Sequence, residues 1–348
     1  MGATSHDVAR AAGVSQSTVS RALRGEAGMS EQTRERIRAV AAELSYVPSE
    51  IGRSLSTRAT RRIGVVAADL TNPFFPELVE PLREDLDRNG YRTLLITDHE
   101  QNPVEIGRLA DGSLDGVVLT TTLLGSSLPE ELSTRGIPYV IVNRDVDDID
   151  ADTCVVDNRR GALEVAEYLA GLGHCRIAAI FGPADTSTGR DREAGFRDGL
   201  ARSRVGLPGT FVRRGVFAHA TGRRATLELL ALPQPPTAVF CGNDVIAMGA
   251  CSAAIAAGLR VPADLSIVGF DDIPMSAWDV IDLTTVHTGI QTMAHIAVSF
   301  LLRRIKEPST PVQRVVLRPR LVLRGTHGSP ASPPQAGAGA RQGTVNPR

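Results

Sequence analysis

The chain has 348 residues, of which 42% are hydrophobic, so it can bury sizeable cores, and its length predicts two or three domains. No apolar run reaches the roughly 20 residues of a membrane-spanning helix, and the N-terminus lacks the basic and apolar regions of a secretory signal. We therefore expect a cytoplasmic protein. The four cysteines show no C-x-x-C pairing and no histidines at metal-binding spacing, so we expect free thiols and neither a metal nor a cofactor.

The net charge of −1 conceals an asymmetry along the chain. Residues 1–62 contain ten arginines and six acidic residues, a net charge of +4. The other 286 residues contain 28 basic and 33 acidic residues, a net charge of −5. A basic head on an acidic body is typical of a DNA-reading domain tethered to a domain that does not bind DNA.

Residues 7–21 read D-V-A-R-A-A-G-V-S-Q-S-T-V-S-R, a pattern of two short helices joined by a tight turn. Gly13 lies where the turn favours a left-handed backbone. Ser15 is a suitable N-cap for the second helix. The predicted buried residues are Val8, Ala9, Ala11 and Ala12 in the first helix, and Val19, Ala22 and Leu23 in the second.

The other face of the second helix carries side chains that can hydrogen-bond to base edges or phosphates, namely Gln16, Ser17, Ser20 and Arg21. This layout is typical of a helix-turn-helix whose second helix enters the DNA major groove, and an ordinary helical hairpin in a core is the alternative. A third helix would close the core and end before Pro48. It would be capped by Ser30 and would bury Ile37, Val40, Ala41 and Leu44.

Residues 49–57, S-E-I-G-R-S-L-S-T, are too few for a stable isolated helix, and an exposed linker is expected over 57–62. From residue 63 onward, short apolar strands alternate with helical patterns. Such a sequence indicates parallel sheets covered on both faces, here in two doubly wound lobes with a cleft between them. The predicted strands are 63–68, 93–96, 116–119, 139–142, 176–181, 238–241 and 266–270, and examples of the helices are 75–88, 160–171, 190–201 and 244–258.

Five further motifs follow the helix-turn-helix: N-P-F-F at 72–75, V-V-D-N at 155–158, R-E-A-G-F at 192–196, C-G-N-D at 241–244 and V-G-F-D-D at 268–272. In this order and spacing, over about residues 4–325, the chain resembles the LacI/GalR family of bacterial transcription regulators. The resemblance implies an α plus α/β protein in four parts. These are a three-helix head (1–48), a hinge helix with linker (49–62), a two-lobed periplasmic-binding-protein-like body of doubly wound parallel sheets (63–325), and a disordered tail (326–348).

The resemblance implies that Gln16 and Ser17 are the main operator-specificity pair and that Arg21 contacts a base or phosphate. Glutamine favours adenine when it binds in a bidentate manner. Leu55 would wedge into the minor groove and kink the duplex at a central CG-like step, or else be buried against the body. The full expected DNA-binding set is Thr4, Ser15, Gln16, Ser17, Thr18, Ser20, Arg21, Arg24, Arg53 and Leu55.

Two positions depart from the family pattern. Gly52 replaces the usual alanine before the hinge arginine, at a cost of about 1 kcal/mol of helix propensity, so we expect a hinge that folds only on operator. Gly52→Ala should therefore tighten operator binding. Arg24 replaces the usual asparagine after the second helix, where it is either an added phosphate contact or a solvated charge.

In doubly wound sheets, ligands bind beyond the carboxyl ends of the strands. The residues expected to contact an effector there are Asn72, Phe74, Phe75, Arg144, Asp157, Arg192, Phe217, Asn243 and Asp271, of which Arg192, Asn243 and Asp271 match the family most securely. Two arginines balance two aspartates, so we expect a neutral, hydroxyl-rich ligand such as a sugar or small glycoside. A nucleobase or nucleoside between Phe74 and Phe217 is the alternative ligand. Either aspartate could instead cap a helix or loop.

We expect a homodimer, because the tail lacks an apolar heptad segment, and two heads that read half-sites of a palindromic operator. Effector binding would close the cleft, separate the paired hinges and release the DNA, although ligand-promoted DNA binding remains open. An enzyme is the main rival, but the chain lacks G-x-G-x-x-G after the first strand, G-x-x-x-x-G-K-[ST] and G-x-S-x-G. A solute-binding protein for transport would not need the head, and a non-specific architectural DNA binder would not need the cleft.

Overall fold

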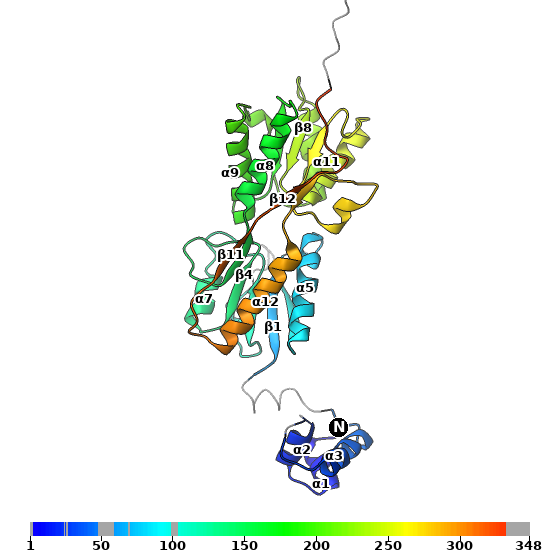
Figure 1. The fold of residues 1–348 in the computed structure, drawn as a ribbon, viewed down its shortest axis with the longest axis vertical. Helices are drawn as coiled ribbons and strands as arrows, with labels where there is room; N and C mark the ends of the chain where they lie inside the picture. The colour runs from blue at the N-terminus through cyan, green and yellow to red at the C-terminus, as the bar shows by residue number, and fades with distance from the viewer. Residues whose placement is uncertain are drawn as a thin grey trace, which may run out of the picture. The chain divides into compact units, whose positions relative to one another are not determined.

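The structure, a computed structural model, describes residues 3–23, 25, 27–47, 59–68, 70–98 and 104–331. The chain divides into two compact units, a head (Met1–Arg62 with Gly112–Asp115) and a body (Ile63–Asp111 with Gly116–Arg348). Figure 1 shows the elements of each unit. The predicted hinge helix, with Gly52, Arg53 and Leu55, lies outside the described residues, as does Arg24.

Three helices make up the described part of the head, and their boundaries follow from side-chain caps. Ser15 accepts the N–H of Thr18 at 3.2 Å, and Ser30 accepts the N–H of Thr33 at 3.2 Å, so both predicted N-caps are confirmed. Gly13 ends the first helix with φ of 65°, the left-handed conformation predicted for it. The helices are α1 (Ser5–Ala12), α2 (Gln16–Leu23) and α3 (Glu31–Glu43).

The core of the head is built from small and apolar side chains of all three helices. Two residues that we predicted to be buried in this core are exposed. Ala11 lies on the exposed side of α1, and Leu44 follows the end of α3 and is 38% exposed. The observed buried core consists of Val8, Ala9, Ala12, Val19, Ala22, Ile37 and Ala41.

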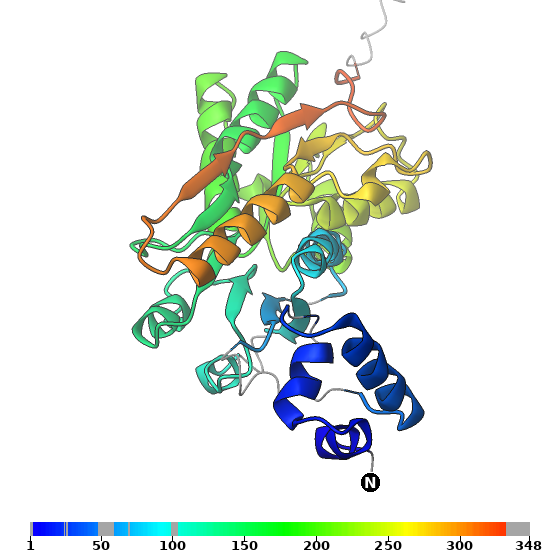
Figure 2. The same ribbon diagram turned by 60° about the horizontal axis from the view of Figure 1, so that its bottom comes forward.

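The first lobe of the body is a six-stranded sheet in the order β11-β5-β4-β3-β1-β2. The β1–β3, β3–β4, β4–β5 and β5–β11 pairs are parallel, as the continuous apolar strands predicted. Helix α12 packs on this sheet beside α5 (Figure 2). In chain order the lobe contains β1 (Arg62–Ala67), α5 (Phe74–Arg88), β2 (Arg92–Thr97), α6 (Ile106–Leu109), β3 (Gly116–Leu119), α7 (Leu128–Thr134), β4 (Tyr139–Val142), β5 (Thr153–Val156), α12 (Ile290–Lys306) and β11 (Arg314–Leu317).

The second lobe is a parallel four-stranded sheet in the order β7-β6-β8-β9, beside an antiparallel β10–β12 pair. Its elements are α8 (Asn158–Gly171), β6 (Ile177–Phe181), α9 (Ser187–Arg202), β7 (Val212–Arg214), α10 (His219–Leu230), β8 (Ala238–Cys241), α11 (Asp244–Ala256), β9 (Ser266–Val268), β10 (Thr285–His287) and β12 (Arg320–Val322), with short 3-10 helices at Gly209–Phe211 and Pro274–Ala277. The chain passes between the lobes three times, after β5, after β10 and after β11.

Helices α8 and α9 approach each other closely because α9 presents glycines to α8. A Cβ at Gly195 would lie 1.9 Å from the carbonyl oxygen of Arg159, and one at Gly199 would lie 2.6 Å from that of Leu163. No larger residue fits at Gly195 unless the two helices separate. This contact fixes the frame of the second lobe from which α9 projects its functional side chains.

The tail does not begin where we predicted. Thr326 is 5% exposed, and Gly328 accepts a hydrogen bond from Ser266 at 3.0 Å, so the chain past 325 still packs on the body. Residues 332–348 lie outside the described part. In the part that the structure describes, no helix is long and apolar enough to cross a membrane. All four cysteines (Cys154, Cys175, Cys241 and Cys251) are free thiols.

Candidate functional site

The outer face of α2 presents the side chains that we predicted to read DNA. Gln16, Ser17, Ser20 and Arg21 are exposed, while Val19 and Ala22 on the opposite face are buried. An exposed polar face on a helix anchored by a small core is the geometry that a major-groove reader requires. The contacts of these side chains with DNA remain a prediction.

Several of these residues form hydrogen bonds within the head. The Gln16 amide donates to the Ser5 hydroxyl at 2.7 Å, and Arg21 donates to the Ala27 carbonyl at 3.0 Å. The Ser15 hydroxyl lies 2.8 Å from the hydroxyls of Ser17 and of Thr18.

Thr4 has a structural role that the sequence prediction did not include. Its hydroxyl accepts the N–H of Asp7 at 3.4 Å, and its own N–H donates to the Asp7 carboxylate at 3.0 Å, which forms a capping box at the start of α1. The Thr4 hydroxyl also donates to the same carboxylate at 2.7 Å. These hydrogen bonds lower the pKa of Asp7. A DNA contact by Thr4 remains a prediction.

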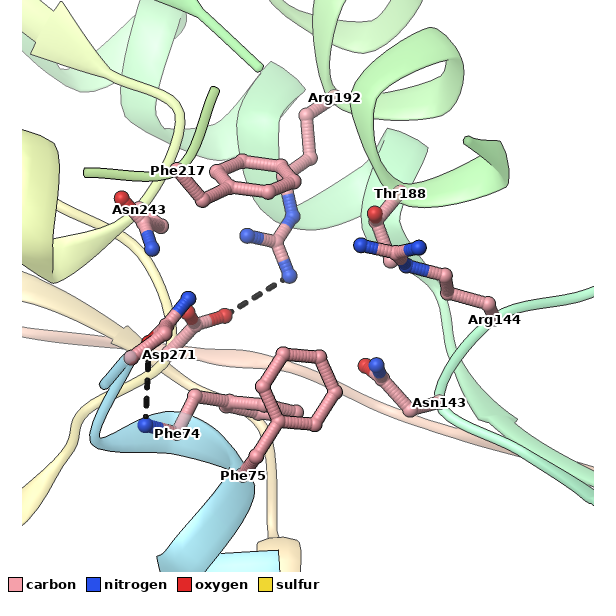
Figure 3. Close-up of a pocket in the computed structure, with 10 residues that line it drawn as sticks. Phe74, Phe75, Asn143, Arg144, Thr188, Arg192, Phe217, Asn243 and Asp271 are labelled. Carbon is pink, nitrogen blue, oxygen red and sulfur yellow. Dashed lines mark hydrogen bonds and ion pairs between the residues drawn. The ribbon is translucent and has the colours of Figure 1, made fainter. Parts of the chain in front are cut away.

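In the body, side chains from both lobes enclose a small chamber of about 20 Å³, which has room for roughly one water molecule (Figure 3). Eight of the nine predicted effector residues line it, so the strand ends do converge as we expected. Two neighbours that were not predicted, Asn143 and Thr188, complete the lining. The lining residues are Asn72, Phe74, Phe75, Asn143 and Arg144 from the first lobe, and Thr188, Arg192, Phe217, Asn243 and Asp271 from the second.

The ninth predicted residue, Asp157, does not line this chamber. Its carboxylate accepts the N–H of Arg160 at 3.0 Å and caps α8, which was the structural alternative for this residue. Its neighbour Asn158 accepts a hydrogen bond from Arg192 at 2.8 Å. Without Asp157, two guanidinium groups face one carboxylate, so the charge balance that favoured a neutral ligand no longer holds.

Arg192 is fixed at the back of the chamber by four partners. Its guanidinium donates to Asn158, to the Gly242 carbonyl at 2.7 Å and to Asp271 at 2.8 Å, and it lies 3.8 Å from the centre of the Phe270 ring. Burial lowers the pKa of Arg192, although Asp271 opposes that shift. Three of its five N–H groups are used in these hydrogen bonds, and one of them positions the Asp271 carboxylate.

Asp271 offers its second carboxylate oxygen to the chamber from a strained turn. The backbone φ of Asp271 is 119° and that of Asp272 is 57°, values that residues other than glycine rarely adopt. Asp244, which is fully buried, supports this turn by accepting the N–H of Ile273 at 3.0 Å. Burial raises the pKa of Asp271 to about 6 despite the attraction of Arg192.

Two asparagines beside the chamber use their carbonyl oxygens to accept backbone N–H groups, Asn72 just before α5 and Asn243 as the N-cap of α11. Asn72 accepts the N–H of Phe74 at 3.1 Å, and Asn243 accepts the N–H of Ile246 at 2.9 Å. Their amide NH₂ groups are left to donate toward a ligand. Asn143 is oriented oppositely: it donates to the Thr120 carbonyl at 3.2 Å and keeps its oxygen as an acceptor.

Aromatic rings border the chamber on two sides. Phe74 and Phe75 meet edge to face with ring centres 5.6 Å apart. Phe217 rests directly over Gly182, where an added Cβ would lie 2.2 Å from its ring. A flat apolar ligand face could therefore lie between Phe217 and the Phe74–Phe75 pair.

A much wider cleft of about 1200 Å³ adjoins the chamber and shares Asn72, Phe75, Arg144 and Phe217 with it. A ligand too large for the chamber can therefore approach the same residues from the cleft. Asp98, Glu131, Asp185 and His219 are the other titratable residues along the cleft walls.

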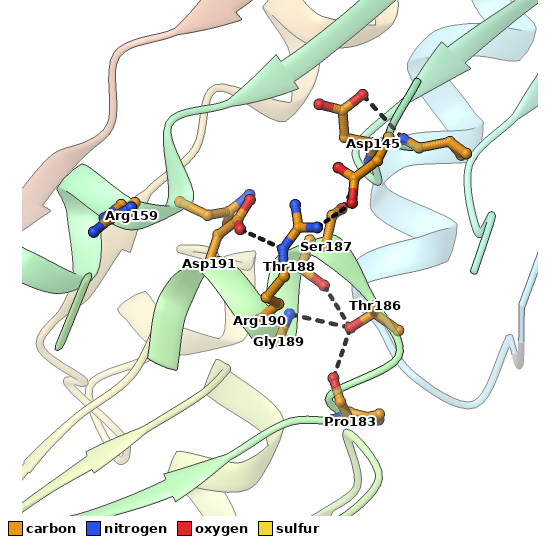
Figure 4. A network of polar contacts seen from close by, with 12 residues as sticks. Asp145, Arg159, Pro183, Thr186, Ser187, Thr188, Gly189, Arg190 and Asp191 are labelled. Carbon is orange, nitrogen blue, oxygen red and sulfur yellow. Dashed lines mark hydrogen bonds and ion pairs between the residues drawn. The ribbon is translucent and has the colours of Figure 1, made fainter. Parts of the chain in front are cut away.

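One rim of the lobe boundary is bridged in this structure, and Figure 4 shows part of the network. The Asp145 N–H donates to the Ser187 hydroxyl at 2.7 Å, and Arg190 of α9 forms an ion pair with Asp147. Asp145 and Asp147 follow β4 in the first lobe, whereas Ser187 and Arg190 begin α9 in the second. These contacts hold the two lobes together beside the chamber.

Comparison with known proteins matches both units. Residues 4–49 match the family model "Bacterial regulatory proteins, lacI family", and residues 166–327 match "Periplasmic binding protein-like domain". The HTH-type transcriptional repressor PurR of Proteus mirabilis is 35% identical over 331 residues, which cover 92% of this chain and 96% of that protein.

Two solved structures extend the likeness to the fold. A lac repressor dimer bound to operator and the anti-inducer ONPF matches with a TM-score of 0.84 at 27% identity, over 94% of this chain and 100% of that chain. A complex of the transcriptional regulator CelR with cellobiose matches with a TM-score of 0.71 at 30% identity, over 93% of this chain and 99% of that chain.

Proposed function

The chain belongs to the LacI family of bacterial regulatory proteins, and from that premise we propose that it represses transcription by binding a palindromic operator as a homodimer. We further propose that a small hydroxyl-rich ligand, bound between the lobes of the body, releases it. The observation that carries the proposal is the chamber at the lobe boundary, where Arg192, Asn243 and Asp271 meet residues of the first lobe.

The head supports the DNA-binding half of this proposal. Two-fold symmetry in a dimer matches two-fold symmetry in its operator, with half-sites about one helical turn apart. The test is selection from random DNA by the purified, ligand-free chain, followed by sequencing. We expect an enriched palindrome with a central CG-like step. Enrichment that needs an added ligand would instead make the chain a corepressor-dependent regulator.

A sugar or glycoside is the ligand class that we propose. Asp271 supplies a carboxylate oxygen, and Asn72 and Asn243 supply amide donors, the groups that bind adjacent hydroxyls. The phenylalanine rings can cover the apolar face of a sugar ring. The solved CelR relative is a complex with cellobiose, which is consistent with this class. Titration of an operator-bound sample with a sugar panel should reveal a compound that lowers operator affinity.

A nucleobase or nucleoside is the second candidate, because Phe217 faces the Phe74–Phe75 pair across the chamber (Figure 3). Planar bases stack well on aromatic rings. Adding purine and pyrimidine bases and nucleosides to the same titration separates the two classes. Release of operator by a base, and by no sugar, would select this candidate.

The effector would act by shifting one lobe against the other. The shift would separate the paired hinges of the dimer and weaken operator binding. A coupling of ~1–3 kcal/mol changes affinity by one to two orders of magnitude. We also propose that the protein acts in the cytoplasm, where its DNA target lies, and catalyses no reaction on its ligand. Chemical turnover of the effector during incubation with the chain would contradict the latter.

A further inference from the structure

The least compensated charge at the chamber is the guanidinium of Arg144. This side chain is 8% exposed, and its Nη1 donates to the carbonyl and hydroxyl oxygens of Thr121 at 3.1 and 3.2 Å. Among the described residues, no carboxylate lies within ion-pair distance of it. Figure 3 shows the Arg144 side chain extending toward the other residues that line the chamber. Buried charges are ordinarily paired, so a buried cation without an anionic partner suggests that the partner is a ligand.

The surrounding charges leave Arg144 uncompensated. Burial lowers its pKa to about 10, and the nearby Arg192 adds to that effect, whereas Asp185 and Asp98 oppose it. Both aspartates line the wide cleft, and Asp185 is exposed to solvent, which screens its charge. Asp271 is already paired with Arg192. Among the residues that line the chamber, two guanidinium groups therefore face one carboxylate.

The hydrogen-bonding groups of the chamber also favour an anionic ligand. Arg144 and the amides of Asn72 and Asn243 offer donors, whereas Asp271 and Asn143 offer one acceptor oxygen each. The 16-residue helix α9 begins beside Arg144 with Thr188 in its first turn. The Thr186 hydroxyl accepts the N–H of Gly189 at 3.0 Å and also the hydroxyl of Thr188 at 3.3 Å. A helix N-terminus adds partial positive charge and free N–H groups at this wall.

We propose that the effector carries a single anionic group, a carboxylate or a phosphate, which binds to Arg144 and the first turn of α9. This inference rests on the proposed function, because it assigns a charge to the ligand of the same chamber. An Arg guanidinium binds either oxyanion through two parallel hydrogen bonds. Arg144 also lines the wide cleft, so the anionic group can enter from there while the rest of the ligand reaches Asp271.

The first experiment uses inorganic phosphate as the probe and the full chain as the protein. Thermal unfolding is followed in phosphate and in chloride at equal ionic strength. We expect phosphate to raise the melting temperature of the wild type, and Arg144→Gln to require at least tenfold more phosphate for the same rise. Arg197→Gln, which removes an exposed cation farther along α9, is the matched control and should behave as the wild type.

The unfolding temperature without phosphate tests whether Arg144 has a purely structural role. If Arg144 binds a ligand, Arg144→Gln removes an uncompensated buried charge and should unfold at or above the wild-type temperature. A purely structural role predicts that it unfolds at a lower temperature. Arg144→Lys keeps the charge but not the two-pronged geometry and should retain part of the phosphate response. The proposal is overturned if phosphate does not protect the wild type, or if it protects Arg144→Gln equally.

The second experiment compares ligands that share one sugar body, namely glucose, glucuronate and glucose 6-phosphate, together with ribose and ribose 5-phosphate. An anionic member should bind at least tenfold more tightly than its neutral counterpart, and Arg144→Gln should remove that preference. Comparing the affinity for glucuronate with that for glucose 6-phosphate shows whether the site prefers a carboxylate or a phosphate. A neutral sugar that binds best and releases operator would overturn this inference but keep the proposed function. Operator binding that no ligand affects would contradict the proposed function, and the phosphate result would still decide the role of Arg144.

Discussion

Arg192 on α9 and Asp271 after β9 form an ion pair of 2.8 Å although 79 positions separate them in the chain. Both side chains are almost fully buried, at 4% and 6% exposure. The pair joins two elements of the second lobe at the point where the ligand is proposed to bind. Its loss should therefore affect stability as well as ligand binding.

Replacement of one partner should be costly. Arg192→Met leaves the buried Asp271 carboxylate without its counter-ion, which should lower the free energy of unfolding by about 3–5 kcal/mol. The measurement is urea denaturation of the full chain. Arg159→Met, which removes the exposed pair with Asp198, is the control and should lower the free energy of unfolding far less, because solvent screens that pair. Equal losses in the two variants would refute the structural importance of the buried pair.

The role of Gln16 can be tested by operator discrimination. Gln16→Ala removes a side chain able to contact adenine at two points, and it should reduce discrimination at one base pair by about 1–3 kcal/mol. Binding of the selected operator and of single-base variants is measured at one salt concentration. Gln32→Ala, on the exposed surface of α3, is the matched control. An unchanged preference in Gln16→Ala would remove this residue from the specificity pair.

The ion pair between Asp147 and Arg190 should influence the spacing of the lobes. Arg190→Asp places a carboxylate opposite Asp147 across the rim and beside Asp191. The repulsion between the new carboxylate and Asp147 should move the lobes apart. Small-angle X-ray scattering of the ligand-free chain should then give a larger radius of gyration. The exchanged pair Asp147→Arg with Arg190→Asp should restore the wild-type value. A radius insensitive to the reversal would show that the Asp145–Ser187 contact suffices.

The buried side chain of His174 should make the free energy of unfolding decrease in mild acid. It is 1% exposed, its ring nitrogens lie 2.8 Å from the Thr237 hydroxyl and from the Gly328 carbonyl, and burial lowers its pKa below 6.5. The unfolded chain therefore binds a proton first as the pH falls below about 6.5, so the free energy of unfolding decreases there. Urea denaturation at pH 7.5 and 5.5 measures the effect.

The control for this pH prediction must allow for Asp271, whose raised pKa has the opposite sign. Its protonated form is favoured in the folded chain, so it increases stability as the pH falls below about 6. The quantity to compare is therefore the pH-dependent loss in the wild type minus that in His174→Gln. A difference of zero would contradict the role assigned to His174.

Much of the fold was predictable because local signals determine it. Strands β3, β4 and β8 have the predicted ends, since each is a short apolar run bounded by a polar residue, proline or glycine. The prediction placed the end of β9 two residues too late, at Phe270 rather than Val268, because apolar character continues into the turn at Asp271. The predicted elements did not include α12, and its position on the first-lobe sheet depends on contacts distant in sequence.

The candidate site was predictable in part for the same reason. Residues at strand ends converge because the topology brings those ends together, so eight of the nine predicted residues line the chamber. Asp157 also follows a strand, and only the three-dimensional structure shows that its carboxylate turns toward α8. Thr188 could have been found, since it lies one helical turn before Arg192 on the same face of α9.

The glycine contact between α8 and α9 implies that some positions of this protein can change in evolution much more readily than others. Gly195 cannot accept a side chain without forcing the helices apart, so the frame that holds Arg192 and Asp271 should change very slowly. Phe217 lies in the connection before α10 and takes no part in the contact between α8 and α9. Descendants of this regulator could thus acquire new ligands by changing a few rim residues, while inheriting the machinery that transmits the signal.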